Sequence, residues 1–268
     1  GGDIPRNPVA HGFAVLHDDS SIDLFMEPVK LAALTAHFED DVRLHAPEAF
    51  LAFLAELGGP VVIDKQTVPV IVADRLAERL VWGDDPCALP KARKNEAEIK
   101  GATAAHMRDG AALCELLAWL DAQPIGSVDE TQVVRELENW RRKDNALQDI
   151  SFDTIAGTGP NGAIMHYQVT EETNATLKDG DLLVLDSGGQ YLDGTTDITR
   201  TVAIGRVDAE ARRAFTRVLS GMIAMSRLRW PNGLSGSHIE AIGRLPLWMA
   251  GQDFDHGLGH GVGAYLSV

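Results

Sequence analysis

The sequence Leu182-Leu-Val-Leu-Asp186-Ser-Gly-Gly-Gln-Tyr-Leu-Asp-Gly-Thr-Thr-Asp197 decides the fold of the second half of the chain. Its first four residues are apolar on both faces, which is typical of a buried strand, and Asp186 follows them directly. Asp193-Gly194 is a turn signal, so the chain is expected to fold back and carry Asp197 on an antiparallel partner strand. A buried carboxylate is costly unless it is paired or bound to a metal. The stretch therefore predicts a hairpin with an acid on each strand.

The register of this hairpin determines whether the two acids meet. If Asp193-Gly194 forms a two-residue turn, Gln190 faces Asp197 and Asp186 points to the same side. At roughly 3.3 Å per residue, Asp186 then lies about 13 Å along the strand from Gln190. We therefore expect strong twist, or a bulge at Gly188-Gly189, to bring both acids to one site.

The segment Asp255-His256-Gly-Leu-Gly-His260-Gly-Val-Gly263 adds imidazoles to these acids. Judged from the hairpin alone, Asp197 could equally cap a turn or pair with Arg200. The segment has two histidines and four glycines in nine residues, and glycines let the backbone approach a ligand closely. Two carboxylates with one imidazole form an oxygen-rich ligand set suited to manganese, cobalt or zinc. The combination indicates a divalent metal.

The remaining histidines carry weaker signals. The turn-rich loop Gly157-Thr-Gly-Pro-Asn-Gly-Ala-Ile-Met-His166-Tyr167 delivers His166 beside an aromatic ring, and by itself this pattern favours a structural role. His106 lies among helix formers and is also interpreted as structural. The histidines of the first ninety residues are scattered and are interpreted as surface or packing residues: His11, His17, His37 and His45.

Helix and strand patterns divide the chain near residues 90 to 95. Before this point, short apolar runs at 13–16 and 60–63 alternate with helical patterns at 48–57 and 71–81, which predicts an α/β domain over residues 1–93. After it, helical runs at 94–122 and 130–143 precede strand-like sequence beyond Ser151. Further helical stretches at 208–228 and 238–249 complete a predicted α+β domain over residues 94–268.

The ends of the chain indicate a fragment. Residue 1 is Gly, and residues 263–268 stop inside an alternating run that predicts a strand.

Composition excludes several classes of protein. The formal net charge of −15 repels phosphate backbones and anionic membrane surfaces, so nucleic acid and membrane partners are not expected. The two cysteines form no C-x-x-C pair, which argues against a disulfide scaffold and favours a cytoplasmic protein. No apolar stretch is long enough to span a bilayer.

The hairpin, the glycine-histidine segment and the His166 loop together resemble the pita-bread metallopeptidase family, in particular its aminopeptidase P branch, which removes an N-terminal residue that precedes proline. The resemblance implies an α+β fold class: a partial pita-bread catalytic domain from residue 94 onward, truncated at its C-terminus, preceded by an α/β domain of the creatinase N-terminal type. The opening Gly2-Asp-Ile-Pro-Arg-Asn-Pro8 resembles the start of the intermediate domain of three-domain members, whose first domain is then missing.

The resemblance also implies roles for residues of this chain. Asp186 matches an acid that binds one metal, Asp197 the acid that bridges two metals, and His260 the single imidazole ligand. His166 and His256 match catalytic histidines that contact the substrate. The implied cofactors are two divalent ions, most often Mn²⁺, with Zn²⁺ or Co²⁺ as alternatives. The family completes its site with one more histidine and two glutamates, which are expected beyond Val268, so this chain alone is expected to be inactive.

The aminopeptidase has four alternatives. Two acids at 186 and 197 argue against metal-free creatinase, and the preceding α/β domain argues against methionine aminopeptidase. A prolidase-type dipeptidase is harder to separate, because dipeptide specificity depends on residues that this sequence does not contain. A catalytically inactive module that binds peptides or proteins is disfavoured because all three ligand types are present. The resemblance implies peptides with proline in second position as substrates, and a homodimer as one assembly.

Overall fold

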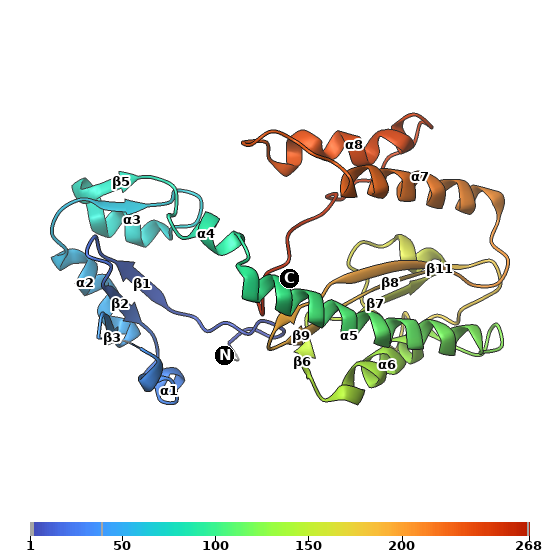
Figure 1. Cartoon of the computed structure of the whole chain (residues 1–268), viewed down its shortest axis with the longest axis horizontal. Helices are drawn as coiled ribbons and strands as arrows, with labels where there is room; N and C mark the ends of the chain where they lie inside the picture. The colour runs from blue at the N-terminus through green and yellow to red at the C-terminus, as the bar shows by residue number, and fades with distance from the viewer. Residues whose placement is uncertain (1–2, 39, 267) are drawn as a thin grey trace. The chain divides into compact units, whose positions relative to one another are not determined.

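The computed structural model describes residues 3–38, 40–266 and 268. Contacts divide the chain into two compact units that meet between residues 99 and 100, and each unit is described by itself (Figure 1). The predicted domain boundary between residues 93 and 94 lies just before this division and stays a prediction. In the described part of the chain, no helix combines the length and the apolar composition that a membrane crossing requires.

The first unit consists of short strands that alternate with short helices. Its elements are β1 (Phe13–Leu16), β2 (Ile22–Phe25), α1 (Pro28–Leu31), a 3₁₀ turn (Thr35–His37), β3 (Val42–His45), a 3₁₀ turn (Pro47–Ala49), α2 (Phe50–Glu56), β4 (Val61–Ile63), α3 (Val70–Leu76), a 3₁₀ turn (Ala77–Arg79), β5 (Leu80–Trp82) and α4 (Ala88–Ala92). The strands β2 and β3 run parallel, as do β4 and β5, while β1 is antiparallel to β2. Parallel pairs joined by helices agree with the expected α/β pattern.

The helix expected over residues 71–81 ends earlier than predicted. It stops at Leu76, and residues Leu80–Trp82 form β5 instead. Helical periodicity continues through this stretch, but the parallel partner β4 supplies hydrogen bonds that the isolated sequence does not reveal. Tertiary pairing therefore overrides the local pattern.

A buried carboxylate organises the sheet of the first unit. Asp23 is 1% exposed and accepts hydrogen bonds from Arg43 Nε at 2.9 Å and Arg43 Nη2 at 2.7 Å. His17 Nε2 and His45 Nε2 lie 2.6 Å and 2.5 Å from its two oxygens. The hydrogen bonds from Arg43, assisted by those to His45 and His17, hold the pKa of Asp23 well below its usual range. The sequence places these histidines apart, and a shared carboxylate brings them together.

The second unit contains the longest helices of the described residues. Its elements are α5 (Glu96–Asp121), α6 (Glu130–Arg141), a 3₁₀ turn (Arg142–Asp144), β6 (Leu147–Ile150), β7 (Ile155–Thr158), a 3₁₀ segment (Gly159–Ala163), β8 (Leu182–Ser187), β9 (Gly189–Tyr191), β10 (Gly194–Thr195), β11 (Ile198–Ala203), α7 (Ala209–Ser226) and α8 (Gly236–Trp248). These bounds agree with the helices expected from residue 94 onward to within a few residues.

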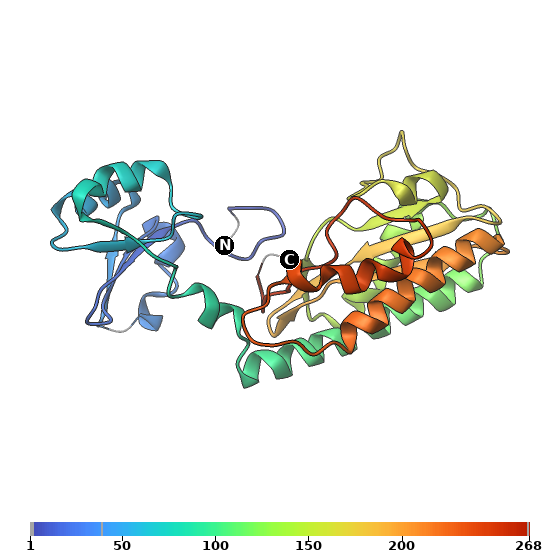
Figure 2. The same ribbon diagram turned by 90° about the horizontal axis from the view of Figure 1, so that it is seen from above.

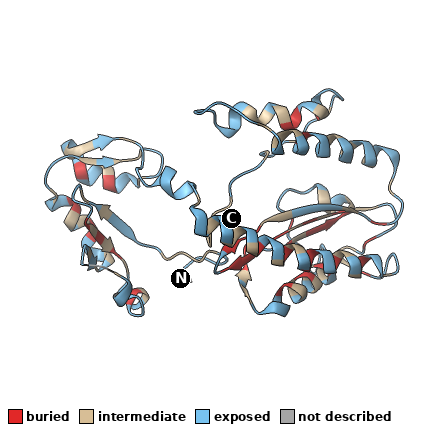
Figure 3. Cartoon of the chain, in the orientation of Figure 1, coloured by how far each residue is buried: buried red, intermediate tan, exposed pale blue. Residues whose placement is uncertain are grey.

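Antiparallel strands and two helices form the core of this unit. One sheet has the order β11-β8-β7 and another the order β10-β9-β6. Leucines 113 and 116 of α5, Leu137 of α6 and Leu183 and Leu185 of β8 meet in one buried cluster. Figures 1 and 2 show α7 and α8 lying together on the opposite side of the sheet from α5 and α6. Figure 3 shows that buried residues gather in the layer between the sheet and α5 and α6, whereas α7 and α8 are mostly exposed.

The hairpin has a different register from the one predicted. Gly194 pairs with Tyr191, so Leu192 and Asp193 form the turn, and Gln190 pairs with Thr195 rather than with Asp197. The prediction took Asp193-Gly194 for the turn because that dipeptide favours left-handed turns. Gly194 does not adopt a left-handed backbone here. A Cβ at Gly194 would lie 3.0 Å from Ala102 Cα, so the glycine serves the close approach of α5 to the hairpin.

Two other features of the second unit concern its last helices and its end. The helices α7 and α8 touch through glycines, since a Cβ at Gly221 would lie 2.1 Å from the carbonyl oxygen of Gly243.

The strand expected over residues 263–268 is absent from its described part, residues 263–266 and 268. A strand needs a partner, and within the described ranges no strand pairs with this segment. Ser267 lies outside the described residues.

The contact between α5 and the hairpin turn predicts opposite effects for two glycines of the same helix. A Cβ at Gly101 would lie 2.1 Å from the carbonyl oxygen of Asp193, so Gly101→Ala should lower the free energy of unfolding by about 1–3 kcal/mol. Gly110 has no heavy atom within 4 Å of such a Cβ, so Gly110→Ala should raise it by about 0.5–1 kcal/mol. Urea unfolding followed by circular dichroism measures both, and equal effects would contradict the close contact.

The buried Asp23 predicts a pH-dependent stability of the first unit. Because the pKa of Asp23 is lowered by folding, its stabilisation is complete above about pH 4 and is lost as the pH falls below that value. At pH 7, Asp23→Asn should cost about 1.5–3 kcal/mol, the range for hydrogen bonds to charged groups. Amide exchange of β1, β2 and β3 reports this unit, and the exposed Asp18→Asn serves as control. An Asp23→Asn effect that persists unchanged at pH 2 would contradict the assignment.

Candidate metal centre

The observed register brings the two acids together without a bulge. Asp186 pairs with Thr199 on β11, and Gln190 pairs with Thr195 on β10, so one register runs along the whole hairpin. Asp197 then stands opposite Gly188, two residues along the strand from Asp186 and on the same face. Diagonal neighbours of this kind lie about 7–8 Å apart at Cα, within reach of two carboxylates and an ion between them. The distance problem posed by the predicted register therefore disappears.

The electrostatics of Asp197 reflect its neighbours. Its side chain is 17% exposed. Burial raises the pKa of Asp197, and the Asp186 carboxylate raises it further, while His260 and His106 act in the opposite direction. Asp186 itself accepts a hydrogen bond from Thr199 Oγ1 at 2.6 Å. Two carboxylates that repel one another on one face form a site that a cation would stabilise.

His260 completes the group from the glycine-rich segment. Its Nε2 lies 3.4 Å from Asp197 Oδ2, and its side chain is 57% exposed. Its Nδ1 lies 2.9 Å from the carbonyl oxygen of Gly261 and donates to it, and Nε2 is the nitrogen that faces the carboxylate. A histidine that ligates a metal usually donates its other ring N–H in this way.

The chemical types of the three donor side chains suit a divalent ion, and the structure brings these side chains together two at a time. Two carboxylates and an imidazole suit manganese, zinc or cobalt. Asp197 meets Asp186 on one side and His260 on the other. Among the described residues, however, no three His, Cys, Asp or Glu side chains are grouped closely enough to hold an ion. Asp186, Asp197 and His260 are thus candidate ligands that meet in pairs and are not gathered around one point.

His166 lies in a strained loop with a firm attachment. Its backbone has φ of 53°, a left-handed conformation that is uncommon for a non-glycine residue, and its side chain is exposed. The next residue, Tyr167, is 5% exposed and donates a hydrogen bond to Glu130 Oε2 at 2.8 Å. Asn161 Nδ2 also binds Glu130 Oε1, at 3.0 Å. Glu130 therefore holds both sides of the loop that presents His166.

His256 is placed by a buried arginine of α8. Arg244 is 9% exposed and donates to the carbonyl oxygens of Phe254 at 2.5 Å and His256 at 2.6 Å. The His256 ring is exposed and packs on Phe254 with centroids 4.4 Å apart. In the described part of the chain, no hydrogen bond or ion pair joins His166 or His256 to the two acids. Their predicted roles toward a substrate stay predictions.

The sequence analysis predicts no role for Glu130 or Arg244. Glu130 begins the helical run expected at 130–143, and Arg244 lies within the helical stretch expected at 238–249. A signal existed for both, because each is a charged residue at a position that its helix buries. Charged residues in the buried stripe of a helix require a partner, and here the partners are the loops that carry His166 and His256.

Comparison with known proteins places this geometry in context. The profile described as "Metallopeptidase family M24" matches residues 100–268, and the profile "Creatinase/Prolidase N-terminal domain" matches residues 1–98. The chain is 42% identical over 279 residues to a "Probable Xaa-Pro aminopeptidase P" of Laccaria bicolor, with 100% of this chain and 43% of the relative covered. It is 37% identical over 277 residues to "Xaa-Pro aminopeptidase 1" of Dictyostelium discoideum, covering 100% of this chain and 44% of that protein.

Solved structures give the same picture of the fold. The X-prolyl aminopeptidase from Caenorhabditis elegans, a cytosolic enzyme with a di-nuclear active site, matches with a TM-score of 0.90 and 30% identity, over 99% of this chain and 46% of that chain. The prolidase from Pyrococcus horikoshii matches with a TM-score of 0.76 and 23% identity, over 97% and 74% of the two chains. The chain thus spans less than half of the aminopeptidases that it matches.

The strained carboxylate pair predicts that Asp197→Asn stabilises the metal-free chain. Because the pKa of Asp197 is raised by folding, its ionised form is disfavoured in the folded state, and the penalty is present at pH 7 and absent below about pH 4. The substitution should raise the free energy of unfolding at pH 7 by about 0.5–1 kcal/mol, the scale of a partly exposed charge interaction. Thermal unfolding in a chelator measures it, with the exposed Asp255→Asn as a charge-matched control. A lower stability would mean that partners stabilise the carboxylate.

Proposed function

The chain belongs to metallopeptidase family M24, and from that membership we propose that it forms part of an Xaa-Pro aminopeptidase. The membership agrees with the family expected from the sequence. The expected fold class, a pita-bread catalytic part preceded by a creatinase-type N-terminal part, is confirmed by the two profiles and by the likeness to the C. elegans enzyme. The reaction proposed is hydrolysis of the bond between an N-terminal residue and a following proline.

One observation carries the proposal: Asp186 and Asp197 lie on one face of a hairpin, with His260 Nε2 3.4 Å from Asp197 Oδ2. Asp186 is the proposed ligand of one ion, Asp197 the ligand shared by two, and His260 the imidazole ligand. These residues would hold two divalent ions, whose chemistry would be to polarise the scissile carbonyl and to activate water. The di-nuclear active site of the C. elegans enzyme supports two ions, and manganese is the proposed metal, with zinc or cobalt as alternatives.

His166 and His256 are the proposed contacts to the substrate. Both rings are exposed and both backbones are fixed from behind, by Glu130 through Tyr167 and by Arg244. A donor held in advance at the position where negative charge develops lowers the barrier without reorganisation. We therefore assign them to the developing oxyanion and the peptide backbone.

The proposal extends to partners and location. The substrates are peptides with proline in second position, by analogy with the relatives named Xaa-Pro aminopeptidase. The net charge of −15 disfavours nucleic acid and anionic membranes as partners. A cytoplasmic location is supported by the cytosolic C. elegans enzyme, and a homodimer is the proposed assembly.

The similarities rank the aminopeptidase above the prolidase-type dipeptidase. The Laccaria bicolor aminopeptidase is 42% identical to this chain, whereas the prolidase of known structure is 23% identical and supports only a shared fold. An inactive binding module would not need a pair of carboxylates that repel one another. A further histidine and two glutamates are proposed to complete the site in the longer protein, since the chain covers 43% of its relative.

Peptide hydrolysis by the longer protein tests the proposal. With Mn²⁺, it should release the first residue from an Xaa-Pro-Xaa tripeptide and leave an Xaa-Ala-Xaa tripeptide intact. Asp197→Ala should lower kcat/KM on the order of 10³-fold, because a metal supplies several kcal/mol of charge stabilisation. Cleavage of Xaa-Pro dipeptides alone would favour the prolidase, and absence of both metal and turnover would favour the binding module.

The 268-residue chain itself is expected to show no turnover. Three protein ligands are too few to hold two divalent ions tightly. An assay of the purified chain with the same tripeptide measures this. Hydrolysis faster than in buffer alone would show that the three described ligands are enough for activity.

A further inference from the structure

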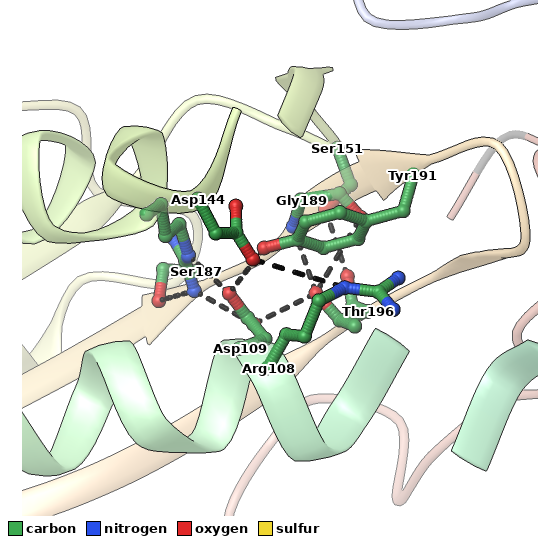
Figure 4. A network of polar contacts seen from close by, with 9 residues as sticks. Arg108, Asp109, Asp144, Ser151, Ser187, Gly189, Tyr191 and Thr196 are labelled. Atoms are coloured by element: carbon green, nitrogen blue, oxygen red, sulfur yellow. Dashed lines mark hydrogen bonds and ion pairs between the residues drawn. The ribbon is translucent and has the colours of Figure 1, made fainter. Parts of the chain in front are cut away.

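A buried ion pair lies behind the hairpin that carries the two acids. Asp109 of α5 and Arg141 of α6 have side chains that are 0% exposed. Arg141 Nε lies 2.5 Å from Asp109 Oδ1, and Arg141 Nη2 lies 3.0 Å from Asp109 Oδ2, so the guanidinium binds both oxygens. Figure 4 shows Asp109 at the centre of a group of polar contacts.

The remaining bonds of the pair go to the hairpin. Tyr191 donates to Asp109 Oδ1 at 3.0 Å, and Thr196 Oγ1 donates to Asp109 Oδ2 at 2.7 Å. Arg141 Nη2 donates to Ser187 Oγ at 3.0 Å. Burial, together with the charge of Asp109, raises the pKa of Tyr191, so this phenol stays protonated and remains a donor. Two strands of the hairpin are therefore attached to one ion pair.

The points of attachment are the immediate neighbours of the proposed metal ligands. Ser187 directly follows Asp186, and Thr196 directly precedes Asp197. Successive side chains of a strand point to opposite faces, so these two hydroxyls face the helices while the carboxylates face the other way. Each ligand is thus fixed at the adjacent residue, from behind.

The antiparallel pairing of the two strands is also tightly fixed at Gly189 and Thr196. Gly189 N donates to Thr196 Oγ1 at 2.8 Å, and Thr196 N donates to the carbonyl oxygen of Gly189 at 2.9 Å. Ser151 Oγ donates to the carbonyl oxygen of Thr196 at 2.9 Å. A Cβ at Gly188 would lie 1.9 Å from that carbonyl oxygen, so only glycine fits opposite Asp197. Thr196 is the residue through which these bonds and the ion pair meet.

We propose that Asp109 and Arg141 are positioning residues that hold Asp186 and Asp197 at the separation a divalent ion requires. The inference rests on the proposed function, since it concerns the same ligands. Two carboxylates repel one another when no cation lies between them. A rigid attachment behind each strand resists that repulsion and keeps the two carboxylates in place before the ion arrives. Binding is then stronger because the ion does not have to order these side chains.

Substitution of Thr196 tests the proposal without leaving a buried charge unpaired within the ion pair. Thr196→Val keeps the shape of the side chain and removes both the bond to Asp109 and the bond that Gly189 N donates to Thr196 Oγ1, so Ser187→Ala is needed to separate the two. The matched control is Thr158→Val, because Thr158 is 2% exposed, lies in the same unit on β7 and donates to Asp181 Oδ2 at 3.2 Å. Ser187→Ala provides a second variant that removes only the bond from Arg141.

Two measurements are made, Mn²⁺ binding on the longer protein and amide hydrogen exchange on the 268-residue chain. Binding of Mn²⁺ is followed by the electron paramagnetic resonance signal of the free ion. The Mn²⁺ affinity should fall about tenfold in Thr196→Val, which is the lower end of the range for residues that support metal ligands. It should remain unchanged in Thr158→Val. Amide hydrogen exchange of residues 186–199 without metal should be at least about tenfold faster in Thr196→Val than in Thr158→Val. Ser187→Ala should change both in the same direction.

The two measurements separate this inference from the proposed function. Unchanged exchange in Thr196→Val overturns the inference, whatever the metal affinity. Faster exchange with unchanged Mn²⁺ affinity also overturns it, because the ion pair would then serve the fold alone. If the unsubstituted longer protein binds no Mn²⁺, the proposed metal site is wrong, and exchange alone determines whether the ion pair holds the hairpin.

Discussion

The ion pair between Asp109 and Arg141 connects helices α5 and α6 of the second unit to both strands of its acidic hairpin. Asp109 accepts hydrogen bonds from Arg141, Tyr191 and Thr196, so both oxygens of its carboxylate have partners. Burying such a pair costs several kcal/mol per ion, and apolar residues of the same size often give equal or greater stability. Stability alone therefore does not account for the pair. Its directional bonds specify one position of the hairpin against the helices, which an apolar contact would leave free to slide.

The site in front of the hairpin has the opposite energetic character. Asp197 lies partly buried beside Asp186, and both burial and the like charge raise its pKa. The apolar cluster between α5, α6 and β8 supplies the stability that such an arrangement requires. Unfavourable charge on one face of the sheet is thus offset by hydrophobic burial on the other. A cation would turn the repulsion into coordination, which is the behaviour expected of a metal site.

The histidines are held differently from the acids. Asp186 lies on β8 and Asp197 directly precedes β11, whereas His166, His256 and His260 lie on loops with exposed rings. His166 and His256 are nevertheless attached through the backbone, by Glu130 through Tyr167 and by Arg244. The paired strands thus hold the two acids proposed as ligands, and the loops present the histidines proposed as a ligand and as substrate contacts. This division agrees with the general location of binding residues on loops that a rigid scaffold supports.

Sequence alone predicted the hairpin, its two acids and the long helices, because hydrophobic periodicity and local residue chemistry carry that information, and the resemblance of its motifs indicated the family. It could not determine the register, because Gly194 was needed for contact with α5 rather than for the turn. It missed β5, whose parallel partner lies elsewhere in the chain, and it predicted a strand after Gly263 that has no described partner. The pairing of Asp109 with Arg141 and of Glu130 with Tyr167 depends on helices and loops that meet only in the folded chain. Local patterns thus determined which residues are candidates for the chemistry, and tertiary contacts decided where each one lies, since distances across the fold are set by packing and not by spacing along the chain.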